Sequence, residues 1–140
     1  MSDIPPYIIS FDPGGTTGWA SYTNGVITTG CFPNNTKVDH YIQLGCLVIC
    51  ERPFLTLKVN PIVFEVKGAI DERAYTKGCQ VIYYPPSNKE FMKNRHEMFS
   101  YVKGIEHSKD ALCHLIWYLS RGKKILFDDC VKMIDKNVRR

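Results

Sequence analysis

The sequence from Tyr7 to Tyr22, YIISFDPGGTTGWASY, decides the fold. Its first residues favour a strand that leads to Asp12, Pro13-Gly14-Gly15 predicts a turn, and Thr17 begins a second strand-like run. A carboxylate held at the end of a strand beside a tight turn is well placed to bind a metal ion. The alternative is an aspartate that only begins a turn, because Asp-Pro-Gly is common turn chemistry. This stretch alone leaves both interpretations open.

Length and composition indicate an ordinary globular protein. The chain has 140 residues, of which 44% are hydrophobic and 23% are charged, and this length predicts a single domain over residues 1–140. Its apolar runs are far shorter than the ~18–20 residues that a membrane span needs. The N-terminal sequence MSDIPPYII lacks the basic region and the long apolar region of a signal peptide. We therefore expect a cytoplasmic protein.

Charge and cysteine content add two expectations. The net charge is +4, and many lysines and arginines fall in the second half of the chain, which favours an anionic partner. A diffuse, solvated basic surface is the alternative. The six cysteines show neither a C-x-x-C pair nor a paired zinc-ligand spacing, so we expect reduced thiols. Cys46 and Cys50 are expected to be buried, four residues apart on a helix.

The order of predicted elements indicates a mixed α/β sheet covered by helices. Thr23-Asn24-Gly25 predicts a hairpin after the second strand and hence an antiparallel three-strand meander that ends near Gly30. Two further strands are expected, one at Ile62–Phe64, which leads directly into Glu65, and one at Gln80–Tyr84. Helices are expected over residues 37–51, 87–101, 108–121 and 125–138, with a loop or about two helical turns over 67–78.

Three carboxylates have ordered positions in this scheme. Asp12 and Glu65 each end a strand, and Asp110 lies in the first turn of the helix over 108–121. His107 precedes Asp110 by three residues, so the two share one helical face. Clustered carboxylates repel one another unless divalent cations neutralise them, and oxygen ligands favour Mg²⁺ or Mn²⁺. Two such ions could support phosphodiester cleavage.

Each of these residues also has a plainer explanation. Glu65 could form an exposed ion pair, and Asp110 could interact with the helix dipole. His107 could be an ordinary residue at a helix start. His114 lies one turn beyond Asp110 within an apolar stripe, so we interpret it as a core or supporting histidine. A zinc site with the pattern H-x-x-D-x-x-x-H remains an alternative.

Three segments together resemble the RuvC-type Holliday junction resolvases, whose fold belongs to the ribonuclease H-like superfamily. The segments are IISFDPGGTTGWASY around Asp12, FEVKG around Glu65 and EHSKDALCHLIWYL around Asp110. They follow one another in the order of the family, and small phage-encoded members look closest in size. The resemblance implies a ribonuclease H-like nuclease domain with an antiparallel three-strand meander, two further strands and covering helices.

The resemblance also implies an activity. It indicates a Mg²⁺-dependent (or Mn²⁺-dependent) endonuclease that cleaves four-way or other branched DNA with two ions in each active site. Asp12, Glu65 and Asp110 would hold the metals, and His107 would complete the catalytic set as a ligand or a phosphate-positioning group. The expected DNA-binding residues are Lys67, Lys89, Lys93 and Arg95. A homodimer is expected on DNA, because symmetric cleavage of a four-way junction needs two active sites, and the compartment would be a bacterial or phage-infected host cytosol.

One segment departs from the family pattern. Only residues 66–78 separate Glu65 from the strand Gln80–Tyr84. Bacterial members carry a longer helix there, which helps to pair two subunits and places an aromatic wedge at the crossover. Tyr75 is the aromatic residue available in this segment for such a wedge.

Two other functions stay open. A catalytically silent nucleic-acid-binding module would share the fold, although an intact acidic set favours catalysis. An actin-like or sugar-kinase-like nucleotide-binding domain would also place an Asp, glycines and two threonines at its first hairpin. Proteins of that kind bind the nucleotide between two such domains, and 140 residues are too few for them.

Overall fold

The computed structural model describes residues 3–52, 60–87 and 106–138. Within these residues, five strands form one sheet in the order β3-β2-β1-β4-β5. The strands are β1 (Tyr7–Asp12), β2 (Thr16–Thr23), β3 (Val26–Pro33), β4 (Leu47–Glu51) and β5 (Gln80–Tyr84). The helices are α1 (Val38–Tyr41), α2 (Pro61–Thr76), α5 (Glu106–Trp117) and α6 (Phe127–Lys132), with a π-helical turn, η1 (Tyr118–Gly122), and a 3₁₀ turn, η2 (Lys136–Val138). The predicted mixed α/β fold class is confirmed.

The first three strands form the predicted antiparallel meander. β1 pairs with β2 and β2 pairs with β3, both antiparallel. Asn24 and Gly25 at the second connection both have positive φ, 46° and 93°, as the tight two-residue hairpin turn requires. Asn-Gly is therefore the local cause of this hairpin, as its sequence indicates.

The chain after the meander differs from the prediction. The helix expected over residues 37–51 is wrong: α1 covers only Val38–Tyr41, and Leu47–Glu51 is strand β4. β4 is parallel to both β1 and β5. A strand in the middle of a parallel sheet is buried on both faces and therefore has a continuous apolar run without alternation. Cys46 and Cys50 are buried as free thiols, but neither lies on a helix.

A second difference concerns the strand expected at Ile62–Phe64, which is wrong. These residues lie in the 16-residue helix α2. Asn60 caps the helix, because its side-chain Oδ1 accepts a hydrogen bond of 3.0 Å from the backbone N–H of Ile62, and Pro61 occupies the first turn. Val66, Ile70 and Ala74 then recur every four residues and are buried. The segment between β4 and β5 is thus a crossover with a 16-residue helix, whereas the sequence predicts only a loop or about two helical turns over residues 67–78.

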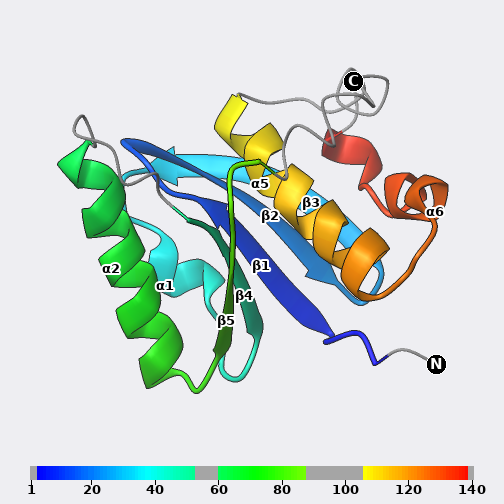
Figure 1. Cartoon of the computed structure of the whole chain (residues 1–140), viewed down its shortest axis with the longest axis horizontal. Coiled ribbons are helices and arrows are strands. Elements are labelled where there is room, and N and C mark those ends of the chain that lie inside the picture. Colours follow the sequence, from blue (N-terminus) through cyan, green and yellow to red (C-terminus); the bar gives the residue numbers. More distant parts are fainter. Residues whose placement is uncertain (1–2, 53–59, 88–105, 139–140) are drawn as a thin grey trace.

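The helices cover the sheet on two sides, as Figure 1 shows for α2 and α5. One core cluster joins alternate residues of β1 and β4, such as Ile8 and Ile49, to α5. The other joins the intervening residues, such as Ile9 and Val48, to α1 and α2. Successive residues of each strand point to opposite faces of the sheet, so even-numbered residues of β1 pack towards α5 and odd-numbered ones towards α1 and α2. In β4 the odd-numbered residues pack towards α5.

The C-terminal third agrees with the sequence prediction where it is described. α5 and η1 together span 106–122 and confirm the helix expected over 108–121. α6 and η2 replace the single short helix expected over 125–138. The helix expected over 87–101 lies outside the described residues, apart from its first position. Among the described helices, none is long and apolar enough to cross a membrane.

Candidate active site

Two carboxylates lie next to each other where β1 and β4 end. Phe11 is in register with Cys50 in this parallel pair, so Asp12 and Glu51 are the next residues on neighbouring strands. Both follow the parity of the side chains that face α5. Parallel neighbours lie about 4.8 Å apart, so strand pairing brings these two acids together on one face of the sheet. The sequence analysis found Asp12 but missed Glu51.

Asp12 is hydrogen-bonded to the first candidate histidine of α5. Nδ1 of His107 lies 3.0 Å from Oδ2 of Asp12. An ionised carboxylate only accepts, so Nδ1 carries the proton in this contact. The Asp12 side chain is 7% exposed and the His107 side chain is 45% exposed. The carboxylate of Asp12 is therefore buried, while the imidazole of His107 remains accessible to a molecule in solution.

A missing side chain allows α5 to come this close. Gly18 is the cross-strand partner of Asp12, and a Cβ built on Gly18 would overlap the backbone carbonyl of His107. The hydroxyl of Ser108 also donates a hydrogen bond of 2.7 Å to the carbonyl oxygen of Gly30 on β3. The start of α5 thus rests directly on β2 and β3, and this contact places His107 beside Asp12.

Glu51 meets a second histidine of the same helix. Nε2 of His114 lies 3.0 Å from Oε1 of Glu51. The His114 side chain is 0% exposed and that of Glu51 is 13% exposed. The ring of Tyr84, from β5, stacks on the imidazole with a centroid separation of 6.1 Å, and burial raises the pKa of this tyrosine. The interpretation of His114 as a core histidine agrees with its complete burial.

Asp110 lies on α5 between the two histidines, three residues after His107 and four before His114. These spacings place all three on one side of the helix. Asp110 is partly buried. The helix therefore brings two imidazoles and one carboxylate to the edge of the sheet where Asp12 and Glu51 lie.

The remaining predicted site residues lie elsewhere or outside the description. Glu65 does not end a strand: it is exposed on α2, the helix on the face of the sheet opposite to α5. Lys67 is on the same helix, where its Nζ lies 2.8 Å from Oδ2 of Asp71 and 4.8 Å from the centre of the Tyr83 ring. Lys89, Lys93 and Arg95 fall outside the described residues.

The side chains gathered at this edge suit a hard divalent cation, since Asp12, Glu51 and Asp110 supply carboxylate oxygens. Among the described residues, no three His, Cys, Asp or Glu side chains group closely enough to hold a metal ion, zinc included. His107 and His114 each contact one carboxylate oxygen, of Asp12 and Glu51 respectively. The donor set fits Mg²⁺ or Mn²⁺ by its chemistry, and it is assembled here as two carboxylate–imidazole pairs.

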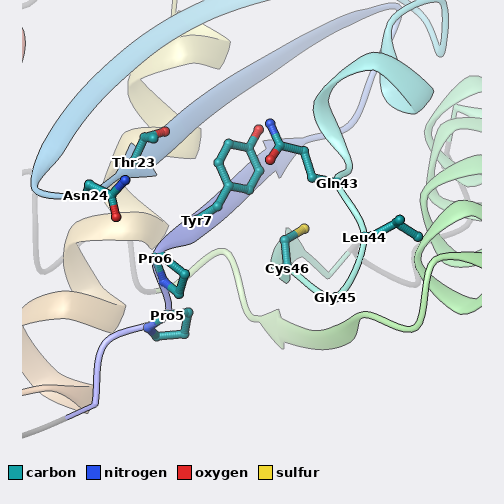
Figure 2. A pocket seen from close by; sticks show the side chains of 9 residues that line it. All are labelled: Pro5, Pro6, Tyr7, Thr23, Asn24, Gln43, Leu44, Gly45 and Cys46. Carbon is teal, nitrogen blue, oxygen red and sulfur yellow. The ribbon is translucent and has the colours of Figure 1, made fainter.

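A pocket of about 300 Å³ opens at the opposite end of β1. Figure 2 shows its lining residues, which are Pro5, Pro6, Tyr7, Thr23, Asn24, Gln43, Leu44, Gly45 and Cys46. Tyr7 begins β1 and Asp12 ends it, so the two ends are about 17 Å apart at ~3.3 Å per residue. The lining has no Asp, Glu, His, Lys or Arg side chain for acid–base chemistry. This pocket is therefore separate from the edge of the sheet where Asp12 and Glu51 lie, which we call the acidic edge.

Comparison with known proteins supports the fold. No protein-family model matches the chain, and no curated protein sequence does. Two structures of RuvC from Thermus thermophilus resemble it, with TM-scores of 0.62 and 0.58 at 15% sequence identity. The matches cover 83% of this chain and 95% and 96% of the respective RuvC chains. The first of these structures is a complex with a Holliday junction substrate. The fold is thus RuvC-like, in agreement with the resemblance seen in the sequence.

Proposed function

We propose that this protein is a divalent-metal-dependent endonuclease that cleaves branched DNA, with the four-way junction as its first candidate substrate. One observation carries the proposal: Asp12 and Glu51 end neighbouring parallel strands on one face, and each accepts a hydrogen bond from a histidine of α5. The RuvC-like fold supports it, because a T. thermophilus protein of that fold has been solved with a Holliday junction.

The proposed metal-binding residues are Asp12, Glu51 and Asp110. Glu51 replaces Glu65, because Glu51 lies on the strand next to Asp12 and Glu65 lies on a helix of the opposite face. Mg²⁺ or Mn²⁺ bound there, as one ion or as the expected pair, would activate a water molecule and neutralise charge on the leaving oxygen. The three carboxylates provide the negative charge that attracts such ions.

His107 has a different proposed task. Its Nδ1–H donates to Asp12, which leaves Nε2 as the ring atom that can exchange a proton or donate to a phosphate oxygen. Its partly exposed ring suits contact with DNA, and the carboxylate behind it fixes the ring orientation. His107 is therefore proposed as a catalytic residue beside the three acids.

DNA binding is proposed to rest on phosphate contacts and on the shape of the branch. Lys89, Lys93 and Arg95 stay as proposed contacts. We leave Lys67 out, because its ammonium group is already engaged by Asp71 and Tyr83. If phosphates dominate, junction affinity should fall steeply as salt rises, and a flat salt response would contradict this part of the proposal.

The proposal can be tested by cleavage of a labelled four-way junction with Mg²⁺ or Mn²⁺, beside linear duplex, a flap and an RNA–DNA hybrid. Two matched substitutions decide the site: Glu51→Gln should reduce cleavage by at least about 100-fold, as expected for loss of a transition-state charge interaction, and Glu65→Gln should leave it unchanged. Asp12→Asn and Asp110→Asn should act like Glu51→Gln while junction binding is retained or tightened.

Each outcome has a defined meaning. Paired symmetric nicks in the junction would support a resolvase, whereas cleavage of flaps or hybrids alone would assign another substrate to the same site. If Glu65→Gln abolished cleavage and Glu51→Gln did not, our assignment of the second acid would be wrong. Junction binding without any cleavage would instead support a catalytically silent binding module.

Symmetric cleavage further leads us to propose a homodimer on DNA. The outward side of α2 carries Phe64, 40% exposed, and Tyr75, 88% exposed. They are eleven residues apart, close to three full turns, and therefore lie on one side of the helix. We propose this side of α2 as the surface that pairs two copies. A protein acting in this way would work in the cytosol of a bacterium or a phage-infected host.

A further inference from the structure

His114 is a buried histidine whose place needs an explanation. It is 0% exposed among the apolar residues of α5, a position that an aliphatic side chain would fill without any polar atoms to desolvate. Its Nδ1 has no hydrogen-bond partner among the described residues. Its other ring nitrogen, Nε2, lies 3.0 Å from Oε1 of Glu51. The hydrogen bond to Glu51 is therefore the contact that offsets the desolvation of the buried ring.

The ring is fixed on several sides. α5 anchors its backbone, and the ring of Tyr84 stacks against it with an interplanar angle of 21°. Glu51 is fixed at its backbone by β4, but its side chain has three rotatable bonds, and ordering such a side chain costs conformational entropy. A rigid donor 3.0 Å from Oε1 holds that side chain in one orientation before any ligand arrives.

The two histidines of α5 differ in a way that separates their roles. They are seven residues apart, which is two helical turns, and each donates to one acid. His107 is 45% exposed and can reach a bound molecule. His114 is 0% exposed and cannot. Its effect on a reaction is therefore indirect, and its hydrogen bond to Glu51 is the contact that leads to a proposed metal ligand.

We infer that His114 is a positioning residue, which orients the carboxylate of Glu51 for metal binding by donating a hydrogen bond from Nε2. That Glu51 binds a metal ion rests on the proposed function. That His114 orients Glu51 rests on the contacts alone. Two substitutions separate the donor from the ring. His114→Phe keeps an aromatic ring against Tyr84 and removes the donor, whereas His114→Gln keeps an N–H near the position of Nε2 and removes the ring.

Three measurements test the inference. The affinity for Mn²⁺ alone is measured by calorimetry, the Glu51 side-chain conformation by NMR couplings, and folding by thermal melting. We expect His114→Phe to melt as a folded protein, to bind Mn²⁺ about 10–100-fold more weakly, as for loss of a hydrogen-bonding partner of a metal ligand, and to show an averaged Glu51 side chain. His114→Gln should restore most of the affinity and the fixed side chain.

The inference is overturned if His114→Phe keeps the wild-type Mn²⁺ affinity and a fixed Glu51, or if His114→Gln is as impaired as His114→Phe. A failure of the proposed function looks different. In that case the wild-type protein would cut none of the DNA substrates, while the NMR comparison of wild type, His114→Phe and His114→Gln would still decide whether His114 orients Glu51.

Discussion

Gly18 on β2 lies directly against the backbone carbonyl of His107, at a point where no Cβ could be accommodated. Gly18 is also the cross-strand partner of Asp12. One glycine therefore decides both how closely α5 approaches the sheet and whether His107 reaches the first acid. The sequence G-T-T-G-W contains this information, but only the packing of a helix more than 80 residues later gives it meaning.

Gly18→Ala should lower the free energy of unfolding by about 1–3 kcal/mol, as expected for overpacking, and should reduce cleavage by about 100-fold because α5 has to move by an ångström or so. Gly68→Ala is the matched control. Nothing lies within 4 Å of a Cβ at Gly68, and alanine is a better helix former than glycine by about 0.5–1 kcal/mol. Denaturant unfolding should show opposite signs for the two variants. Equal destabilisation by both would contradict the close approach at Gly18.

Ser10 tests the second attachment of α5. Its buried hydroxyl donates a hydrogen bond of 2.8 Å to the carbonyl oxygen of Ala111. Ser10→Ala should lower the free energy of unfolding by about 1 kcal/mol and should also reduce cleavage, since Ser10 is two residues from Asp12 on the same face.

Ser21→Ala provides the comparison for Ser10. The Ser21 hydroxyl lies 2.7 Å from that of Thr28. This hydrogen bond joins β2 to β3 and does not involve α5. A similar loss of stability with unchanged cleavage is expected for Ser21→Ala. If both variants cleaved equally well, the bond from Ser10 to α5 would have no influence on the site.

Stability should fall above pH 9. Burial raises the pKa of the Cys46 thiol from 9.0 to about 12 and that of Cys130 from 9.0 to about 11. In the unfolded chain these thiols lose their protons at lower pH than in the native protein. The free energy of unfolding therefore falls as pH rises from 9 towards these pKa values, by up to about 1.4 kcal/mol per pH unit for each thiol.

Denaturant unfolding of wild type, Cys46→Ala and Cys130→Ala between pH 8 and 11 measures this effect. Each variant should show a shallower decline than wild type, whatever its stability at pH 8. Cys31→Ala is the control, because Cys31 is exposed and should leave the slope unchanged. A slope that none of the substitutions alters would refute the role of these thiols.

Tyr75 tests the proposed pairing surface. Tyr75→Glu introduces a charge on an 88% exposed position of α2, so it should leave the melting temperature within a degree or two but weaken a dimer through desolvation and like-charge repulsion. Sedimentation with and without junction DNA measures the assembly. Thr76→Glu, which points away by about 100° on the same helix, should not change it. A monomer on DNA in the wild type would refute the pairing altogether.

The parts of the fold that the sequence predicted correctly depend on local chemistry. Asn24-Gly25 specifies a hairpin, and the apolar stripe that contains Leu112, Leu115 and Ile116 specifies α5. Asp12 ends β1 as predicted, and His107 and Asp110 share one side of α5 at the acidic edge. In each case neighbours in sequence are sufficient to determine the element, whereas the approach of α5 to Asp12 depends on the packing at Gly18.

Two segments differ from the sequence prediction for different reasons. The apolar spacing over residues 37–51 is typical of a helix, but this segment is interrupted at Gly45, where φ is 67°, and Leu47–Glu51 after it is a strand. Ile62–Phe64 is too short for its periodicity to separate a strand from a helix. Asn60-Pro61 was the available signal, since a capping residue followed by proline marks a helix start. Both predictions place an acid at the end of a strand. When the strand is Leu47–Glu51 instead of Ile62–Phe64, that acid is Glu51 and not Glu65.

The pairing of β1 with β4 has a consequence for how such a protein can diverge. The separation of Asp12 and Glu51 is set by the distance between two hydrogen-bonded strands, not by the 38 residues of chain that join them. Insertions, deletions and substitutions in the connecting segments can therefore accumulate without moving one acid relative to the other. A lineage can lose almost all recognisable sequence similarity in this way and still keep both carboxylates at the same mutual distance.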